Sequence, residues 1–297
     1  MLTFKPIEPQ DAQWVTPLLH ASGYMTSTYA FVTLYLWSKA YDTQVARFGD
    51  HVIARSHRGG IFHYLYPSGH GDEKATVDAI IEDAKAQSEP AWLYGVSVEA
   101  KQRLEQWYPG LFTIEAVRDD YEYIYDRAEL ADLPGKKFQK KRNHVSRFIR
   151  ENPDWEFHPI TEESLPLVRQ FNREWAALAD NKDDPGIQME HEAIEMVFDH
   201  YTELPIEGGY ITAGGRVVAY SFGSAINDRT FDTNVEKALY EVNGAYNIIN
   251  REMARQVCAR YEMINREDDV GSEGLRKAKL SYNPIIIEPK YRAVLNK

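Results

Sequence analysis

Phe4-Lys5-Pro6-Ile7, near the start of the chain, has a counterpart in Phe157-His158-Pro159-Ile160 in the second half. In both places a short extended segment ends at proline, and an acidic segment, 8–11 or 161–164, precedes a helical pattern. The apolar faces of these two helices are formed by Trp14, Val15, Leu18 and Leu19 and by Leu165, Val168, Phe171 and Trp175. The two stretches indicate that the chain repeats one structural unit.

Both halves continue with the same predicted order of elements. In the first half we expect strands at 44–48, 51–56 and 60–66, a helix over 72–87, a buried strand at 91–96, a helix over 99–108 and a closing strand pair within 112–125. In the second half the counterparts are strands at 209–213, 217–225 and 229–233, a helix over 244–260, a strand at 261–265, a helix over 273–282 and a closing strand pair within 285–295.

This order of strands and helices is typical of the acetyltransferase-like (GNAT-like) fold. We therefore predict an α/β (α+β) protein with two tandem acetyltransferase-like domains, each a mixed sheet flanked by helices. The predicted domains cover residues 1–132 and 151–297, and a basic linking helix covers 133–150. The alternative is a chance succession of short strand–helix units, which are common in α/β proteins.

The composition argues against several classes of protein. Acidic residues outnumber basic ones by 45 to 34, and the net charge of −11 argues against stable DNA binding and against binding to anionic membranes. No apolar run reaches about eighteen residues, so no membrane span is expected, and residues 1–6 lack the basic segment of a secretion signal. Cys258 is the one cysteine and lies in a helical pattern, where a buried structural thiol is expected. We therefore predict a cytoplasmic protein.

A basic segment between the two halves departs from this acidic composition. Residues 133–150 contain no acid, and their positive side chains are Lys136, Lys137, Lys140, Lys141, Arg142, Arg147 and Arg150. Three interpretations stay open: a solvated helix face, a contact with phosphate groups, or an internal brace that pairs with acids of the second half. The candidate phosphate-binding residues are Lys136, Lys137, Lys140, Lys141, Arg142 and His144.

Two longer motifs resemble a known family. They are Pro134-Gly135-Lys136-Lys137-Phe138-Gln139-Lys140-Lys141-Arg142-Asn143-His144 and Asn265-Arg266-Glu267-Asp268-Asp269-Val270-Gly271-Ser272-Glu273-Gly274-Leu275-Arg276-Lys277-Ala278-Lys279. Both are similar to sequences of the bacterial family related to the C-terminal domain of phosphatidylglycerol lysyltransferase, and the resemblance covers nearly the full chain. It implies a tandem acetyltransferase-like fold akin to the Fem-type, aminoacyl-tRNA-dependent transferases that modify lipids or peptidoglycan precursors. It also implies that the basic helix contacts the acceptor stem of tRNA, and it leaves the substrate open.

The coenzyme A loops of ordinary acetyltransferases are poorly matched in this sequence. Such a loop carries a base and two small residues before a helix, and its backbone N–H groups hold the pyrophosphate. In the second-half loop, 241–246, Glu241 replaces the base and Tyr246 replaces a small residue, while the first-half loop, 66–71, has both glycines but no base. A carboxylate beside a pyrophosphate weakens its binding. No cofactor is therefore firmly implied, and aminoacyl-tRNA is favoured over acyl-coenzyme A as the donor.

The strongest candidate site is the acidic segment Asn265-Arg266-Glu267-Asp268-Asp269. It follows the predicted strand 261–265, and α/β sheets bind ligands at the carboxyl ends of their strands. Three successive acids can supply a general base, an amine-binding site or, less readily, a metal site, and no metal is predicted. Capping of the following helix is an equally open alternative. The candidate catalytic residues are Glu267, Asp268, Asp269 and Lys279, because Lys279 stands near the position of the tyrosine that protonates the leaving thiol in many acetyltransferases.

Further candidates surround this segment. The predicted substrate-binding residues are Asp232, Asn234, Tyr246, Asn265, Arg266 and Arg276. Asp232 and Asn234 are expected to end a core strand where the fold opens, although a plain strand exit to solvent explains them equally well. Arg276 and Lys279 lie one helical turn apart, so both can point back over the acidic segment.

The favoured hypothesis is an acyl or aminoacyl transferase in which an amine or hydroxyl attacks an activated ester. In this hypothesis Glu267 or Asp268 acts as base or amine anchor, and Arg276 with the basic helix holds phosphate or the developing oxyanion. The alternative is a non-catalytic module that keeps a degenerate acetyltransferase fold and senses a small anion. RNA binding alone is opposed by the net charge of −11.

Overall fold

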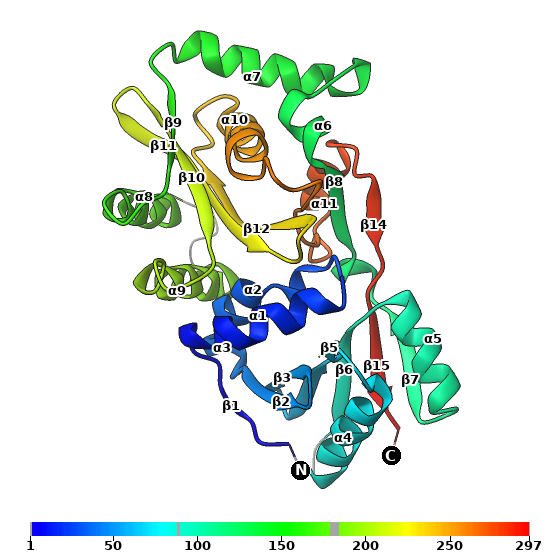
Figure 1. Ribbon diagram of the computed structural model, residues 1–297. Helices are drawn as coiled ribbons and strands as arrows, with labels where there is room; N and C mark the ends of the chain where they lie inside the picture. Colours follow the sequence, from blue (N-terminus) through cyan, green and yellow to red (C-terminus); the bar gives the residue numbers. More distant parts are fainter. Residues whose placement is uncertain (1, 88–89, 179–183, 297) are drawn as a thin grey trace.

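The computed structural model describes residues 2–87, 90–178 and 184–296, and its strands form two sheets (Figure 1). The first sheet has the order β1-β2-β3-β4-β6-β15-β7 and contains β1 (Lys5–Pro6), β2 (Gln44–Phe48), β3 (His51–Arg58), β4 (Ile61–Leu65), β6 (Ala91–Val96), β15 (Tyr291–Leu295) and β7 (Phe112–Ala116), with β5 (Ser68–Gly69) beside β3. The second has the order β14-β8-β13-β12-β11-β10-β9 and contains β14 (Ile286–Glu288), β8 (Glu122–Asp126), β13 (Met263–Asn265), β12 (Thr230–Ala238), β11 (Arg216–Ala225), β10 (Glu207–Ala213) and β9 (Glu156–Pro159). Each sheet is mixed, because β4 runs parallel to β6 and β12 runs parallel to β13.

Helices cover both sheets and fill the space between them (Figure 1). Their bounds are α1 (Ala12–Ala21), α2 (Phe31–Leu36), α3 (Ser38–Tyr41), α4 (Glu73–Ala86), α5 (Val98–Trp107), α6 (Arg127–Asp132), α7 (Gln139–Glu151), α8 (Leu165–Leu178), α9 (Pro185–Asp199), α10 (Ala245–Glu252) and α11 (Glu273–Leu280). Helices α1, α2 and α3 lie between the two sheets, and α2 contacts both β11 and α9 of the second half. The basic helix α7 packs on α10 at the far end of the second half.

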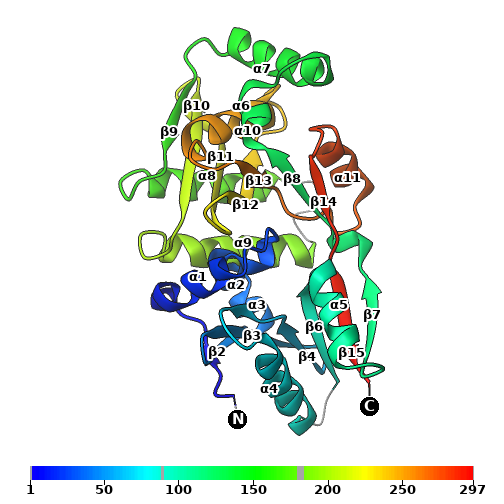
Figure 2. The same ribbon diagram turned by 45° about the vertical axis from the view of Figure 1, so that its right-hand side comes forward.

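The two sheets exchange strands, which the sequence analysis did not predict. The expected closing pairs within 112–125 and 285–295 are wrong, because β7 pairs with β15 whereas β8 pairs with β13 and β14. Figure 2 shows β8 and β14 side by side in one sheet and β15 beside β6 and β7 in the other. The sheets therefore do not follow the predicted boundaries of 1–132 and 151–297. Alternation of apolar residues defines a strand but carries no information on its partner.

Most of the predicted elements occur, with shifted ends. The buried strand at 91–96 is confirmed as β6, whereas the strand predicted at 229–233 continues to Ala238 as β12. The helix predicted over 244–260 is shorter: α10 ends at Glu252 and continues as a π-helical turn, Met253–Val257. Local chemistry explains other ends, since Asp72 caps α4 by accepting a hydrogen bond from the Ala75 N–H (2.9 Å).

One hydrophobic core joins the two halves. It contains buried residues of α1 and α2, such as Val15 and Phe31, together with Tyr123 of β8 and Phe222 of β11. Cys258 belongs to the same core and is fully buried, as expected for a structural thiol. A separate core lies between the first sheet and α4 and α5. Because α1 and α2 are buried against the second half, the fold depends on contact between the halves.

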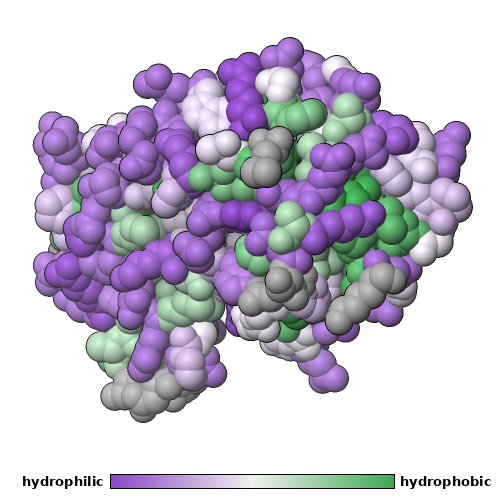
Figure 3. Space-filling model, turned by 90° about the horizontal axis from the view of Figure 1, so that it is seen from below, coloured by the Kyte–Doolittle hydropathy of each residue, from purple (hydrophilic) through white to green (hydrophobic). Residues whose placement is uncertain are grey.

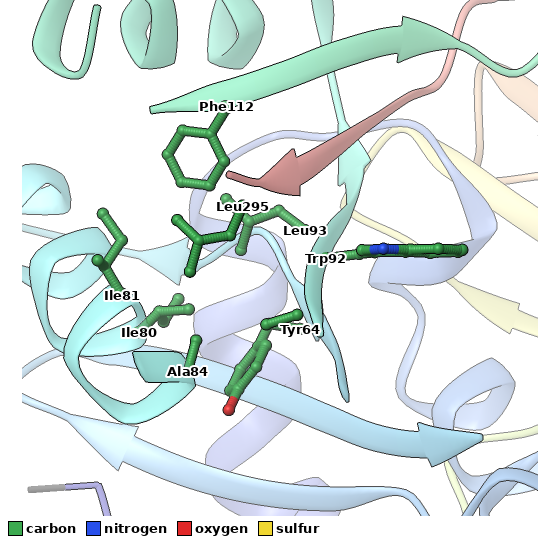
Figure 4. Close-up of a pocket in the computed structure, with 9 residues that line it drawn as sticks. Tyr64, Ile80, Ile81, Ala84, Trp92, Leu93, Phe112 and Leu295 are labelled. Carbon is green, nitrogen blue, oxygen red and sulfur yellow. The ribbon is translucent and has the colours of Figure 1, made fainter. Parts of the chain in front are cut away.

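The exchanged strand β15 completes the separate core of the first sheet. In Figure 4, Leu295 of β15 and Phe112 of β7 converge with Ile80 and Ile81 of α4, whereas the Trp92 ring points away. The gap between these side chains holds about 10 Å³ and has an apolar lining. A gap of this size is a packing defect, because it accommodates one water at most and offers it no hydrogen bond.

The outer surface agrees with the charged composition. Seen from below, the molecule is covered mostly by hydrophilic residues with scattered hydrophobic ones (Figure 3). Among residues 2–87, 90–178 and 184–296, no helix combines the length and apolar character needed to cross a membrane.

The strand exchange predicts that a charge in β15 destabilises the protein. Ala293 is fully buried between β6 and β7, so Ala293→Asp should lower the free energy of unfolding by about 3 kcal/mol or more. Arg292→Gln on the same strand loses a half-exposed ion pair with Glu115 and a cation–π contact with Trp92 (4.3 Å), and it should lower the free energy of unfolding by about 1 kcal/mol. Urea denaturation followed by circular dichroism measures both. Equal stability of the two variants would contradict the assignment of β15 to the first sheet.

Candidate active site

The second sheet opens next to the acidic segment. The parallel pairing of β12 with β13 is confined to Thr230–Asp232 and Met263–Asn265; β13 then ends while β12 runs on to Ala238. The prediction that Asp232 and Asn234 end their strand is therefore wrong, because both lie inside β12. They lie where its pairing with β13 stops, and both are buried. Ligands of α/β sheets bind where neighbouring strands diverge at their carboxyl ends.

Glu122 of β8 is the hub of the polar network beneath this opening. Its fully buried carboxylate accepts hydrogen bonds from the Ser27 backbone N–H (2.7 Å) and hydroxyl (2.8 Å), from the Asn265 amide and from Lys290 Nζ (2.6 Å). Burial alone would lower the pKa of Lys290, but the charges of Glu122 and Asp268 outweigh it and raise that pKa. Neither Glu122 nor Lys290 belongs to a sequence motif, and neither was predicted as a site residue. The available signal was an acid directly before the residues Tyr123, Ile124 and Tyr125 of a strand, since an acid buried with them needs partners.

Asp232 is fully buried and only half satisfied. Its Oδ2 accepts hydrogen bonds from the Thr33 hydroxyl of α2 (3.0 Å) and the Asn234 amide (2.8 Å), whereas its Oδ1 has no partner among the described residues. Burial raises the pKa of Asp232 well above its usual value, and the charge of Glu122 adds to this effect. Because Thr33 lies in the first half of the chain and Asn234 in the second, both halves donate hydrogen bonds to the Asp232 carboxyl.

Glu267 and Asp268 form the rim of the same network. Glu267 has a left-handed backbone (φ 58°), and its N–H is held by the Asn265 side chain (2.7 Å). This conformation is unfavourable for a residue with a side chain and is typical of functional loops. Burial raises the pKa of Glu267, as does the neighbouring Asp232, and burial also raises the pKa of Asp268. Asp268 lies 3.9 Å from Lys290 Nζ.

Asp269 and Arg276 bind each other. Arg276 donates two hydrogen bonds to the buried Asp269 carboxylate (both 2.8 Å), which also accepts from the Tyr123 hydroxyl and the Gly271 N–H (3.0 Å). The bonds from Arg276 hold the pKa of Asp269 below its usual value. A carboxylate held in this way is a poor proton acceptor, so its predicted catalytic role is opposed by its contacts. Capping of α11 was left open for Asp268, Asp269 and Ser272, and the structure confirms it for Ser272, whereas the carboxylates of Asp268 and Asp269 accept from N–H groups of the preceding turn.

Lys279 lies against the backbone of the acidic segment. Its Nζ donates to the carbonyl oxygens of Arg266 and Asp268, and burial lowers its pKa. The charge of Glu267 acts in the opposite direction on the Lys279 pKa, so this amine and this carboxyl titrate together. We refer to Glu122, Asp232, Glu267 and Asp268, with the amines of Lys279 and Lys290, as the acidic cluster.

A half-buried pair of cations, Lys141 and Arg266, flanks the acidic cluster. Arg266 pairs with Glu236 (2.7 Å) and lies 5.0 Å from the Tyr282 ring, while Lys141 of α7 lies 3.7 Å over the same ring. Burial lowers the pKa of Lys141 to about 8, and the charge of Arg266 acts in the same direction. Lys141, one of the predicted phosphate-binding residues, therefore lies at the edge of the site.

The other basic residues of this region differ in exposure. Lys137 pairs with Glu129, and Arg142 donates to the carbonyl oxygens of Leu133 and Gly135. Lys136, Lys140 and His144 are exposed. Tyr246 packs against Tyr240, with ring centroids 5.5 Å apart, and none of its described contacts reaches the acidic cluster. The structure thus brings together Asp232, Asn234, Asn265, Glu267, Asp268 and Lys279 and leaves Tyr246 outside.

Both coenzyme A loops are occupied by the chain itself. Gly244 has a left-handed backbone (φ 81°), and a Cβ there would lie 2.5 Å from the backbone oxygen of His144, because α7 packs directly on the loop. In the first half the Gly69 N–H donates to Ser22 Oγ (3.0 Å) and the His70 N–H donates to the Asp50 carbonyl (2.9 Å). Backbone donors that are covered or already bonded cannot hold a pyrophosphate.

The chemistry open to the acidic cluster is binding of a cation or transfer of a proton. Within the described parts of the chain, no group of three or more His, Cys, Asp or Glu side chains is arranged to hold a metal ion. An ammonium group would satisfy the unpaired Asp232 oxygen, and carboxyls with raised pKa values are suited to accept a proton near neutral pH.

The Asp269–Arg276 pair predicts a pH-dependent loss of stability on substitution. Because the folded protein lowers the pKa of Asp269, the pair stabilises the fold above the unfolded pKa of about 3.9, and this stability is lost as the pH falls below that value. Arg276→Met should therefore lower the melting temperature at pH 7, and the deficit should shrink towards pH 3. Thermal denaturation across this range tests it, with Lys277→Met on the exposed side of α11 as control. A deficit independent of pH would show that packing, not charge, is lost.

Solved structures resemble this chain over nearly its whole length. A conserved protein of unknown function from Bacteroides thetaiotaomicron is 37% identical, with a TM-score of 0.96 and full coverage of both chains. L-PGS from Bacillus licheniformis is 16% identical, with a TM-score of 0.67 and coverage of 95% of this chain and 91% of that one. FemX is 10% identical, with a TM-score of 0.65 and coverage of 98% and 96%. The likeness to FemX, together with that to a tandem GNAT protein, confirms the predicted tandem acetyltransferase-like fold.

Sequence relatives agree with this likeness. An uncharacterized protein of Mycoplasmoides gallisepticum is 22% identical over 188 residues, which are 63% of this chain and 60% of that protein. The chain thus spans less than two thirds of that curated relative. Residues 22–294 match the family described as phosphatidylglycerol lysyltransferase, C-terminal, as the two sequence motifs predicted. The chain belongs to this phosphatidylglycerol lysyltransferase C-terminal family.

Proposed function

We propose that the acidic cluster is the active site of an aminoacyl transferase that uses aminoacyl-tRNA as donor and an amine or hydroxyl as acceptor. The observation that carries this proposal is the Asp232 carboxyl, which is fully buried and lies beside Glu267 where the pairing of β12 with β13 stops, and one of whose oxygens has no partner in the described parts of the chain. A buried acid without a full set of partners costs stability, so a ligand that completes the set is expected.

The charge balance of the acidic cluster favours a donor that carries an ammonium group. Four carboxyls face two lysine amines, and the pKa values of three of those carboxyls are raised. An α-ammonium group would bond to the free Asp232 oxygen and lower the repulsion among the acids. An acetyl group carries no such charge, so this cluster discriminates in favour of aminoacyl donors.

The acid and the base for the transfer are available in the same cluster. The acceptor atom bonds to the ester carbonyl carbon, the bond from that carbon to the ribose oxygen breaks, and the acceptor proton passes to Glu267 or Asp232. Lys279 uses two of its three N–H groups on backbone carbonyls, so the third remains to protonate the ribose oxygen. Its lowered pKa makes it a better acid.

Two further observations support tRNA over coenzyme A. Helix α7 covers the second-half loop at Gly244, and the first-half loop uses its N–H groups internally. Lys136, Lys140 and His144 are exposed at the same end of the molecule, where they can bind the phosphates of an acceptor stem. A tRNA donor also agrees with the predicted cytoplasmic location. The contacts of Arg276 oppose its predicted role at the oxyanion, because its guanidinium donates to Asp269 and Asp119.

One observation favours the sensor hypothesis as a second candidate. Arg266 and Lys141 share the Tyr282 ring, and two cations close together form a site for a small anion. The same pair would bind a terminal phosphate of tRNA, so turnover decides between the two hypotheses.

Turnover can be tested with isosteric variants. The protein is incubated with a mixture of charged tRNAs and a small-metabolite extract, and new aminoacylated products are identified by mass spectrometry. Asp232→Asn and Glu267→Gln should each reduce product formation by about 100-fold or more, because each removes a proton acceptor. Glu273→Gln, at the exposed start of α11, should leave it unchanged. Transfer from acyl-coenzyme A instead of tRNA, or full activity in both variants, would contradict the proposal.

The raised pKa of Asp232 also predicts that its loss stabilises the protein at high pH. A buried carboxyl with a raised pKa keeps its proton to a higher pH when folded than when unfolded, so folding stability falls as the pH rises above about 3.9 and stops falling once the folded carboxyl has ionised. Asp232→Asn removes this penalty and should raise the melting temperature at pH 8 but have little effect at pH 4. Thermal denaturation at the two pH values measures the difference. A variant that is destabilised equally at both would assign Asp232 a structural role.

A further inference from the structure

A cavity of about 300 Å³ lies in the first half, next to the acidic cluster. One wall is formed by α2 and α3 with the 3-10 turn Ser27–Tyr29 before them, and the other by β3, β4 and β6. This is the face of the first sheet that looks towards the second half, opposite the face covered by α4 and α5 (Figure 1). The transfer proposed above assigns no role to this cavity.

The cavity reaches the acidic cluster through one side chain. Thr33 lines the cavity, and its hydroxyl donates to Asp232 Oδ2 (3.0 Å) and accepts from the Asn234 amide (2.9 Å). A group bound at this end of the cavity is therefore one side chain away from the proposed base. A molecule that fills the cavity can present its reactive atom to the cluster.

The two ends of the cavity carry opposite charges. Arg58 lies over the Tyr41 ring (4.9 Å), is exposed and has no carboxylate partner among the described residues. Asp120 lines the cavity as well, and partial burial raises its pKa. The charge of Lys290 opposes this shift, so Asp120 lies close to the acidic cluster. An anionic group therefore belongs near Arg58 and a cationic group near Asp120.

The strand register gives the separation of the two ends. Arg58 pairs with Ile61 at the start of β4, whereas Lys290 precedes Tyr291, which pairs with Val96 at the end of β6. Because β4 and β6 are parallel, these two points lie at opposite ends of the sheet. The positive and the negative end of the cavity are therefore separated along the strand direction.

The middle of the cavity is aromatic. Trp37 and Tyr94 line it from opposite walls, together with His63. Flat aromatic faces bind apolar or aromatic side chains and give a specific orientation to a ligand that also makes polar contacts at its ends.

We propose that this cavity binds the acceptor of the transfer reaction and that the acceptor is a short peptide of two or three residues. Its amino terminus lies at Thr33, Asp120 and Asp232, its side chains pack against Trp37 and Tyr94, and its carboxylate is bound by Arg58. This inference rests on the proposed aminoacyl transfer and names the substrate class of the same site.

The reaction on such an acceptor is the formation of one amide bond. The neutral amino nitrogen of the peptide bonds to the ester carbonyl carbon of the aminoacyl-tRNA, and the bond from that carbon to the ribose oxygen breaks. The proton lost by the nitrogen is taken up by the acidic cluster, and the ribose oxygen leaves as a hydroxyl. The product is a peptide longer by one residue and a free tRNA.

Binding without tRNA tests the cavity separately from the reaction. The probes are Ala-Phe, Phe-Ala and Leu-Leu, each compared with its C-terminal amide by isothermal titration calorimetry on the full chain. At least one dipeptide should bind about tenfold or more tightly than its amide, because the amide lacks the charge that Arg58 recognises. Arg58→Met should remove this difference, and Arg47→Met, on the exposed part of the neighbouring strand, should keep it.

Each outcome bears on the proposal. Failure of every dipeptide to bind at millimolar concentration, or equal affinity for dipeptides and amides in the unaltered protein, would overturn it. Binding that survives Arg58→Met with the difference intact would overturn the assignment of Arg58. Peptide binding without transfer from any charged tRNA would support the cavity and remove the proposed function. Transfer to other acceptors without peptide binding would support the proposed function and overturn the assignment of the cavity.

Discussion

The buried carboxylate of Glu122 is the contact on which the arrangement of the two halves depends. It sits in the second sheet and accepts hydrogen bonds from Ser27 of the first half, from Asn265 at the end of β13, and from Lys290 just before β15. Those donors come from three separate regions of the chain. A buried carboxylate tolerates the loss of such partners poorly, so the network fixes the relative position of both sheets. The same network forms the floor of the proposed active site.

The Glu122 carboxylate is fully hydrogen-bonded, whereas other carboxyls beside it are not. Asp232 has an oxygen without a partner among residues 2–87, 90–178 and 184–296, and Glu267 has a left-handed backbone. Both features cost folding free energy, and both occur within one group of side chains where the second sheet opens. Asp269, three residues from Arg266, shows the opposite behaviour, because Arg276 and Tyr123 satisfy it completely. Within this short segment Asp269 therefore stabilises the loop, whereas Glu267 lies at the opening of the sheet.

The sequence allowed the prediction of local features but not of partners. Hydrophobic periodicity predicted β6, α4 and the end of β13 because each depends on a few consecutive residues. The acidic segment after β13 was recognised for the same reason. The exchange of β8 and β15 was missed, since a short alternating strand fits either sheet. Thr33, Glu122 and Lys290 were missed as site residues because tertiary contacts alone, and no motif, bring them to Asp232 and Asn265.

The exchanged strands also have a consequence for synthesis. The first sheet needs β15, which follows every strand of the second sheet in the chain, and the second sheet needs β8 from the first half. Neither sheet can therefore close while the ribosome has produced only the first half. The nascent first half must wait with β6 and β7 unjoined, and their open edges are sites for aggregation or for binding by chaperones. A tandem repeat that looks separable in sequence is, during biosynthesis, one cooperative unit.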